Sequence, residues 1–165
     1  MRTLTAKDVM NSNVLSVRDD LSLAALAEFL VDNEISGAPV EDVEGRLVGV
    51  VSLTDLATWE MDRAVAVPEH SQPDYYLRGW EERWNPEDLV GLRVGEAERT
   101  VGEIMTPSVL AIDEESTIPQ VAKKMIDARV HRLLVTHQRR VVGIVTTTDL
   151  LGLLVDEDED ARAAS

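Results

Sequence analysis

The feature that most constrains this sequence is a segment that occurs twice. The first part of the segment aligns with residues 95 positions further on, as in Met10 and Met105. After one gap the offset becomes 94, as in Gly49 and Gly143. The gap falls between residues 40 and 47, where a polar turn between two strands can lose a residue without moving the strands. The repeat predicts a fold built from two copies of one unit.

The first half of each copy indicates a strand followed by a helix. Residues 14–17 form a short extended run, and Asp19 or Asp20 is expected to cap a helix whose apolar residues recur at helical spacing. In the second copy, Thr117 and Gln120 have the spacing of a capping box at the start of the equivalent helix. Both copies therefore predict a strand and then a helix.

The second half of each copy indicates a hairpin followed by a helix. The apolar runs that form the hairpin strands span residues 38–40, 47–53, 133–135 and 141–145. Each hairpin ends in Thr-Asp, Thr54-Asp55 or Thr148-Asp149, which predicts a helix with a threonine cap and an acidic first turn. Neither unit is large enough to bury both faces of its own sheet. We therefore predict an α/β (α+β) fold in which two tandem β-α-β-β-α units pack about a pseudo-twofold axis.

The segment between the copies has no counterpart in the repeat and carries every aromatic residue except Phe29. These residues are Trp59, Tyr75, Tyr76, Trp80 and Trp84. Asp74 can cap a helix that places the last three of them on one face. Such a stripe is most often core and is otherwise an interface anchor, and we expect part of it to be core. Residues 65–73, with two prolines, are the expected mobile loop.

These patterns divide the chain into four parts. We assign the first repeat to residues 5–57, a helical aromatic insert to 58–99, the second repeat to 100–155 and an acidic tail to 156–165. The tail contains Asp or Glu at five successive positions. It could serve as an acidic ligand for a basic partner, but a solvated, frayed tail is the preferred interpretation.

Composition narrows the classes of partner and of chemistry. Sixteen basic against 31 acidic residues give a net charge of -15, which repels nucleic acid and anionic membrane surfaces. The chain has no cysteine and three histidines, so no thiol chemistry and no metal site are expected. No apolar run approaches the length of a membrane span, and we expect a cytoplasmic location. Motifs that pair a nucleophile with an activating base are missing too, so no catalytic residues are predicted.

Paired motifs mark the start, the hairpin entry and the hairpin exit of each copy. They are Asp8-Val-Met10 and Glu103-Ile-Met-Thr-Pro107, Ile35-Ser-Gly-Ala-Pro-Val40 and Val130-His-Arg-Leu-Leu-Val135, and Gly49-Val-Val-Ser-Leu-Thr-Asp55 and Gly143-Ile-Val-Thr-Thr-Thr-Asp149. Together they resemble the cystathionine-beta-synthase (CBS) domain pair, a nucleotide-sensing regulatory module. The resemblance implies binding of AMP, ADP, ATP or S-adenosylmethionine in clefts between the copies, without catalysis.

The hairpin exits carry groups suited to a nucleotide. The carboxylates of Asp55 and Asp149 can accept from both hydroxyls of a ribose. Hydroxyls with the first amides of the following helix can donate to a phosphate; they belong to Ser52, Thr54, Thr146 and Thr148. The alternative for each Thr-Asp pair is a plain helix cap.

The hairpin entries differ between the copies. His131 and Arg132 supply cationic donors for a phosphate, and the alternative is that Arg132 pairs with a surface carboxylate. The first copy has Ser36 and Gly37 at these positions, without charge, and the glycine lets the backbone approach a flat base closely. Leu134 also stands where the first copy has Pro39. The two sites are therefore expected to be unequal.

The resemblance further implies that each ligand contacts both copies, with its adenine at one hairpin entry and its ribose at the other copy's Thr-Asp. One set would be Ile35, Ser36, Gly37, Ala38 and Pro39 with Thr146, Thr148 and Asp149. The other would be Val130, His131, Arg132 and Leu133 with Ser52, Thr54 and Asp55.

Three functions remain open at this point, in order of preference: a nucleotide-sensing module, a ligand-free dimerisation or scaffold module, and a small enzyme. Repulsion by the acidic chain favours AMP or ADP, or ATP with Mg²⁺. Apolar residues that remain on the outer helices, residues 21–31 and 118–128, predict a homodimer. A module without an output domain also needs a separate protein effector.

Overall fold

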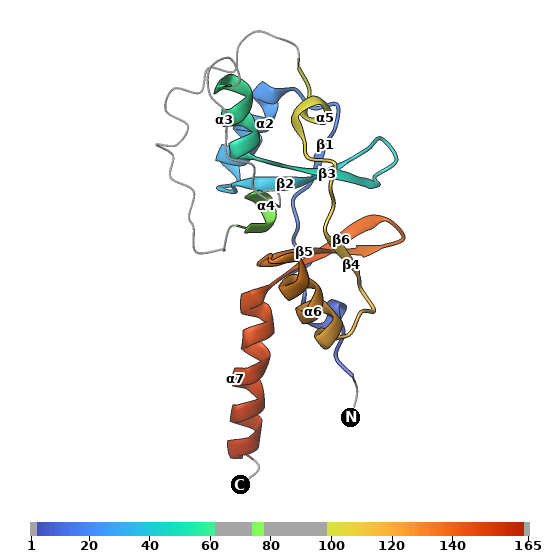
Figure 1. The fold of residues 1–165 in the computed structure, drawn as a ribbon, viewed down its shortest axis with the longest axis vertical. Helices are drawn as coiled ribbons and strands as arrows, with labels where there is room; N and C mark the ends of the chain where they lie inside the picture. Colours follow the sequence, from blue (N-terminus) through green and yellow to red (C-terminus); the bar gives the residue numbers. More distant parts are fainter. Residues whose placement is uncertain (1–2, 62–73, 78–98, 164–165) are drawn as a thin grey trace. The chain divides into compact units, whose positions relative to one another are not determined.

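The computed structural model describes residues 3–61, 74–77 and 99–163, and these form two compact units (Figure 1). We call Leu15–Val109 the first unit, and Met1–Val14 with Leu110–Ser165 the second unit. Each unit contains one copy of the repeat, apart from the residues that begin the copy. Those beginnings are exchanged, so that residues 1–14 belong to the second unit and residues up to 109 belong to the first.

The first unit contains a three-stranded sheet in the order β1-β2-β3. Its elements are β1 (Val17–Arg18), α2 (Leu23–Asp32), β2 (Gly37–Glu41), β3 (Leu47–Ser52), α3 (Leu53–Met61), α4 (Asp74–Leu77) and α5 (Val101–Ile104). Strand β1 runs parallel to β2, and β2 runs antiparallel to β3. In Figure 1, α2 and α3 lie on one face of this sheet and α4 lies on the other.

The second unit has a matching sheet in the order β4-β5-β6, with the same parallel and antiparallel pairings. Its elements are α1 (Ala6–Val9), β4 (Ala111–Asp113), α6 (Ile118–Ala128), β5 (Arg132–His137), β6 (Arg140–Thr146) and α7 (Thr147–Ala163). The predicted order of strand, helix, two strands and helix is therefore confirmed in both copies, as is the α+β class.

The one-residue gap in the repeat lies in the hairpin turns. In the first unit Glu41 pairs with Leu47, while in the second unit Thr136 pairs with Val141, one residue closer. The shorter turn is made by Gln138 and Arg139, whose φ angles are 48° and 66°. Two successive residues at positive φ give a tight turn that follows the twist of the strands. The strands on either side keep their register.

Proline at position 39 explains why β1 is shorter than β4. In the second unit the backbone N–H of Leu134 donates to the Leu110 carbonyl (3.1 Å), and Ala111 pairs with Leu134 at the start of the ladder. Pro39 occupies the equivalent position and has no N–H to donate. The parallel ladder of the first unit accordingly begins one position later, at Val17 and Val40.

The core of the first unit joins α2 and α3 to one face of the sheet. Buried side chains at helical spacing on α2 meet alternate residues of β2. The cluster consists of Val17, Leu23, Leu26, Leu30, Ala38, Val40, Val51, Leu53, Leu56 and Val101. Val31, an apolar position of the same predicted helix, is 38% exposed and lies outside this core.

The cap of α6 was predicted correctly and the cap of α2 was not. Thr117 caps α6, and its N–H donates to Gln120 Oε1 (2.8 Å), as the capping-box spacing indicates. In the first copy the cap is Ser22, which accepts from Ala25 N (3.2 Å), and neither Asp19 nor Asp20. The helix begins at Leu23 because its buried side chain already belongs to the core.

The exchanged segments attach to the free edge of each hairpin. Asn11 forms a two-bond antiparallel bridge with Ile144, and Thr106 forms the same bridge with Val50. Side chains close the joint: a Cβ at Gly143 would lie 2.4 Å from Met10 Sδ, and one at Gly49 would lie 2.8 Å from Met105 Sδ. Each methionine therefore packs on a glycine of its hairpin, which accounts for two of the repeated motifs.

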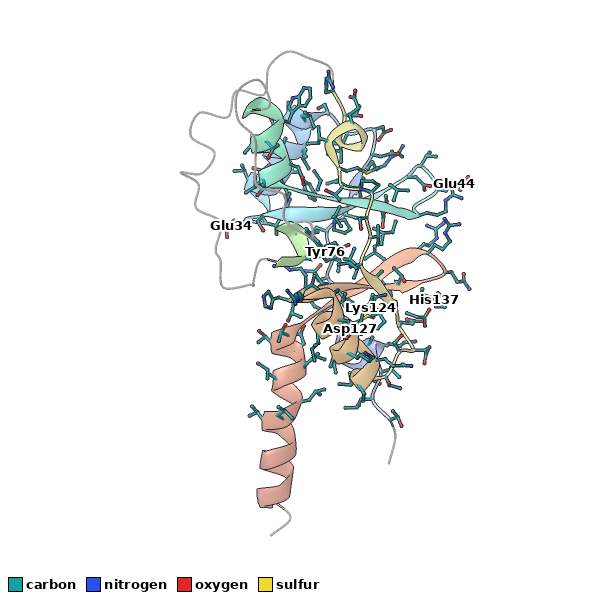
Figure 2. All side chains as sticks on the ribbon, viewed as in Figure 1. Glu34, Glu44, Tyr76, Lys124, Asp127 and His137 are labelled. Atoms are coloured by element: carbon teal, nitrogen blue, oxygen red, sulfur yellow. The ribbon has the colours of Figure 1, made fainter. Side chains whose placement is uncertain are left out.

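Part of the aromatic insert is core, as predicted. Tyr75 and Tyr76 on α4 are 6% and 0% exposed, and their rings meet edge to face with centroids 5.1 Å apart (Figure 2). Trp80, Trp84 and the expected loop at 65–73 lie outside the described residues.

The acidic segment differs from the frayed tail that was expected. Helix α7 continues through it to Ala163. The preceding turns of α7 are already helical, so each further residue adds a hydrogen bond without a new nucleus. Within the described residues, no helix is both long enough and apolar enough to cross a membrane.

Candidate functional site

The exit of the first hairpin is a capping box. The backbone N–H and the hydroxyl of Ser52 both donate to Asp55 Oδ2, at 2.7 and 3.0 Å, and Asp55 N–H contacts Ser52 Oγ at 3.4 Å. A reciprocal cap needs a carboxylate three residues after the hydroxyl. The helix cap is therefore Ser52 and not Thr54, and α3 begins one residue earlier than the predicted cap, at Leu53.

The second hairpin ends in the same arrangement. Thr146 N–H and Oγ1 donate to Asp149 Oδ2, at 2.7 and 2.8 Å, and Asp149 N–H contacts Thr146 Oγ1 at 3.3 Å. Thr146 replaces the predicted Thr148 as the cap, and α7 begins at Thr147. The two exits agree in every contact, so the cap interpretation is correct for both.

The caps change what these groups can offer to a ligand. Oδ2 of Asp149 already accepts two hydrogen bonds, which fill its two lone pairs. Among the described residues none donates to Oδ1 of Asp149, so this oxygen can accept from a hydroxyl. The hydroxyl protons of Ser52 and Thr146 go to the carboxylates rather than outward, contrary to the phosphate-donor role expected of them. Thr148 is exposed and Thr54 half-buried on the first turns.

Hairpin entry and exit lie side by side within each unit. Gly37 is the antiparallel partner of Ser52, and Arg132 is the partner of Thr146. In the second unit the Thr147 N–H also donates to the His131 carbonyl (2.9 Å). Each predicted entry motif therefore borders the exit motif of its own copy. The sharing of a ligand across copies stays a prediction.

The predicted entry residues divide into core residues and surface residues. The side chains of Ala38, Pro39, Val130 and Leu133 are buried, so only their backbone could contact a ligand. His131 is exposed, and Ile35, Ser36 and Gly37 are half-buried. Arg132 is half-buried, with its Nε atom buried. A basic side chain in this position is available on one side of the second hairpin only.

The contact that sequence reasoning missed is Tyr75 against Gly37. A Cβ at Gly37 would lie 2.9 Å from Tyr75 Cδ2, and α4 packs on β3 beside it. The aromatic stripe signalled buried rings in this segment. Nothing in the sequence indicated that one of them lies at a hairpin entry.

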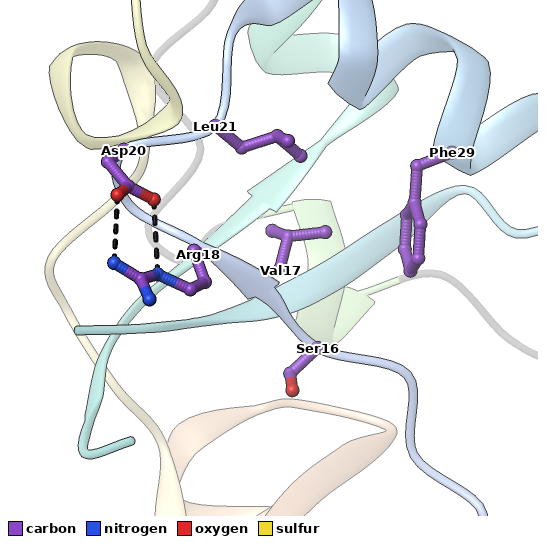
Figure 3. A pocket seen from close by; sticks show the side chains of 6 residues that line it. All are labelled: Ser16, Val17, Arg18, Asp20, Leu21 and Phe29. Carbon is purple, nitrogen blue, oxygen red and sulfur yellow. Dashed lines mark hydrogen bonds and ion pairs between the residues drawn. The ribbon is translucent and has the colours of Figure 1, made fainter. Parts of the chain in front are cut away.

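A separate open depression of about 470 Å³ lies in the first unit. Figure 3 shows the residues that line it: Ser16, Val17, Arg18, Asp20, Leu21 and Phe29. Its two charged groups satisfy each other, because Arg18 Nε and Nη2 donate to the two carboxylate oxygens of Asp20, at 3.1 and 2.8 Å. None of the predicted site residues lines it, so we do not assign the ligand to this depression. No group of metal-binding side chains occurs in the part of the chain that the structure describes.

Comparison with known proteins agrees with this architecture. The family model named CBS domain matches residues 6–62 and again 101–156, one match on each copy. The chain belongs to the CBS domain family. The resemblance inferred from the paired motifs is thereby confirmed for most of the chain.

One relative of this CBS domain pair is the protein CBSX1, chloroplastic, of Arabidopsis thaliana. The two are 31% identical over 120 residues, which cover 72% of this chain. The chain spans 50% of the length of that relative.

Solved structures share the fold. The CBS domain pair of protein MJ0100, in complex with 5'-methylthioadenosine and S-adenosyl-L-methionine, has a TM-score of 0.60 at 23% identity, covering 94% of this chain and 99% of that one. CBSX2 in complex with AMP has a TM-score of 0.63 at 22% identity, covering 93% and 98%. At these identities the likeness establishes the fold of a CBS domain pair.

Proposed function

We propose that this CBS domain pair is a non-catalytic regulatory module that binds an adenosine ligand and signals through a change of conformation. The observation that carries the proposal is the repeated hydroxyl–carboxylate cap beside each hairpin entry, with Oδ1 of Asp149 open to a ribose hydroxyl. The complexes of CBSX2 with AMP and of MJ0100 with adenosine compounds support it, because both proteins share this fold.

The proposed chemistry divides the ligand among three kinds of group. The carboxylate of Asp55 or Asp149 accepts from the ribose. The backbone N–H groups at the starts of α3 and α7 favour an anion, because the positive end of a helix dipole lies there. Arg132 adds a charge-assisted contact to phosphate, about twice as strong as a neutral one. Since the caps use the hydroxyls of Ser52 and Thr146, we now assign the phosphate to Arg132 and the backbone amides.

The charge of the chain favours a ligand with few phosphates. A net charge of -15 opposes each added phosphate, whereas Arg132 and His131 attract the first. We therefore propose AMP or ADP as the ligand, or ATP when Mg²⁺ accompanies it. Transmission of the signal to a separate effector protein is part of the same proposal.

The test compares AMP with adenosine by titration calorimetry. In the wild type we expect AMP to bind at least tenfold more tightly than adenosine, and we expect Arg132→Ala to remove most of that difference. Arg140→Ala is the matched control, because Arg140 is an exposed arginine at the far end of the same hairpin. An Arg132→Ala variant that keeps the wild-type preference for AMP would show that the phosphate is bound elsewhere.

The alternative is a ligand-free dimerisation or scaffold module. Exposed apolar residues favour association: Ile126 on α6 is 74% exposed, and Leu151, Leu154 and Val155 on α7 are 57%, 63% and 59% exposed. The last three are spaced as one helical stripe. We propose a homodimer in either case. A thermal-shift series with AMP, ADP, ATP and S-adenosylmethionine separates the two functions, because only a ligand-binding module gains about 2.7 kcal/mol at 100 times the dissociation constant.

A further inference from the structure

The insert brings an aromatic ring to one hairpin entry. Tyr75 is 94% buried, and its ring meets the face of Gly37 so closely that any larger residue at position 37 would collide with it. Tyr76 beside it is fully buried and holds the Tyr75 ring edge to face. The ring is therefore fixed by packing, although α4 itself is only one turn long.

The same location in the second unit is more open. Ser52, Leu53 and Leu56 at the first exit are 5%, 9% and 1% exposed. Their counterparts Thr146, Thr147 and Leu150 are all half-buried. Within the described ranges the second unit has no helix that corresponds to α4, and its hairpin entry carries Arg132 in place of Gly37. The two copies thus differ in what covers the hairpin entry.

A planar ligand cannot share the Gly37 position with Tyr75. A base between the two would need about 3.5–4.0 Å to the atoms on each of its faces. In the structure a Tyr75 ring carbon lies 2.9 Å from the point where a Cβ of residue 37 would stand, so the two surfaces are already in contact. The flat group that a glycine at this position was expected to admit is supplied by the chain itself.

We propose that Tyr75 is an internal occupant of the first hairpin entry, so that the chain binds one adenosine nucleotide, at the entry formed by Arg132. This inference rests on the proposed function. An internal group that competes for a site lowers the apparent affinity there by the fraction of molecules in which the site is open. The insert thereby sets the number of ligands bound, as a residue that determines specificity.

The experiment is a titration of AMP into the full chain, with the stoichiometry as the readout. We expect one AMP per chain for the wild type and two for Tyr75→Ala. Tyr75→Phe keeps the ring, and we expect one AMP for this control. Tyr75→Leu supplies a second opening variant that retains apolar volume if the alanine variant does not fold.

Hydrogen exchange of the peptide that contains residues 74–77 gives an independent readout in the wild type. We expect its exchange to be unchanged at saturating AMP, because the ligand binds elsewhere. Two AMP molecules per wild-type chain, or folded Tyr75→Ala and Tyr75→Leu variants that still bind one or none, would overturn the inference and leave the proposed function standing. Absence of AMP binding in the wild type and in every variant would overturn both.

Discussion

Replacement of Gly143 by alanine tests the joint between the first residues of the chain and the second hairpin. A Cβ at this position would lie 2.4 Å from Met10 Sδ, 2.8 Å from its Cγ and 3.0 Å from its Cβ. All three contacts belong to one side chain. The variant therefore strains the attachment of residues 10–14 and leaves the strand pairing of β5 and β6 intact.

The magnitude follows from two opposing effects. Overfilling a packed site costs about 1–3 kcal/mol. Alanine in place of glycine in a strand interior gains about 0.5–1 kcal/mol, because the unfolded chain loses less freedom. We expect Gly143→Ala to lower the free energy of unfolding by about 1–2 kcal/mol, equivalent to about 2–8 °C in melting temperature for a chain of this size.

Urea unfolding of the two single variants and of the double variant with Met10→Ala measures the contact directly. We expect Met10→Ala to cost at least about 1 kcal/mol less when residue 143 is alanine than when it is glycine, because the clash is then relieved. A Gly143→Ala variant as stable as the wild type, or costs that simply add, would refute the packing of Met10 on Gly143.

Gly49 provides the matched control in the other unit. A Cβ there would lie 2.8 Å from Met105 Sδ but also 2.8 Å from the backbone oxygen of Thr106. Truncation of the methionine cannot move a backbone atom. We therefore expect Met105→Ala to give little relief to Gly49→Ala, in contrast to the pair at Gly143.

Three further predictions follow from the site, the turn and the exposed helix. Asp149→Asn keeps an oxygen for the cap but turns Oδ1 into a donor, so at least one of Asp149→Asn and Asp55→Asn should weaken AMP binding about tenfold or more by calorimetry, with little change in stability; unchanged affinity in both would disprove the ribose contact. The backbone N–H of Arg46, and then its guanidinium, hold the pKa of Asp42 below its ordinary value. The stabilisation is full above the unfolded pKa and is lost as pH falls through the lowered folded pKa, so the urea midpoint should fall more steeply below about pH 4 in the wild type than in Asp42→Asn; parallel curves would contradict this. Leu154→Gln should shift the dimer towards monomer in light scattering at micromolar concentration, and an unchanged mass would place the interface elsewhere.

Local signals in the sequence predicted the elements well. The repeat placed every strand of both sheets, and the spacing of Thr117 and Gln120 predicted the cap of α6, because a capping box depends on residues within one turn. The same rule, applied to Asp55 or Asp149, would have identified Ser52 and Thr146 as caps. The Thr-Asp pairs drew attention instead, since threonine is also a common cap.

Contacts between distant segments were not predictable in this way. The attachment of Met10 to Gly143 and of Tyr75 to Gly37 joins residues with no periodic relation in the sequence. A glycine signals only that something approaches closely, and the approaching group is decided by the tertiary fold. For Gly37 a ligand and a side chain of the same chain have the same signature.

The exchange of the leading segments has a consequence for the order of events during synthesis. The first unit is one continuous stretch, Leu15–Val109, so all of its partners have been translated when residue 109 leaves the ribosome. The second unit joins Asn11 to Ile144, and residues 1–14 must wait until most of the chain has been made before their edge exists. Contacts of such long separation form slowly. During that interval the nascent second unit presents an unpaired strand edge, β6, which is the point at which a chaperone or a second nascent chain has access to it.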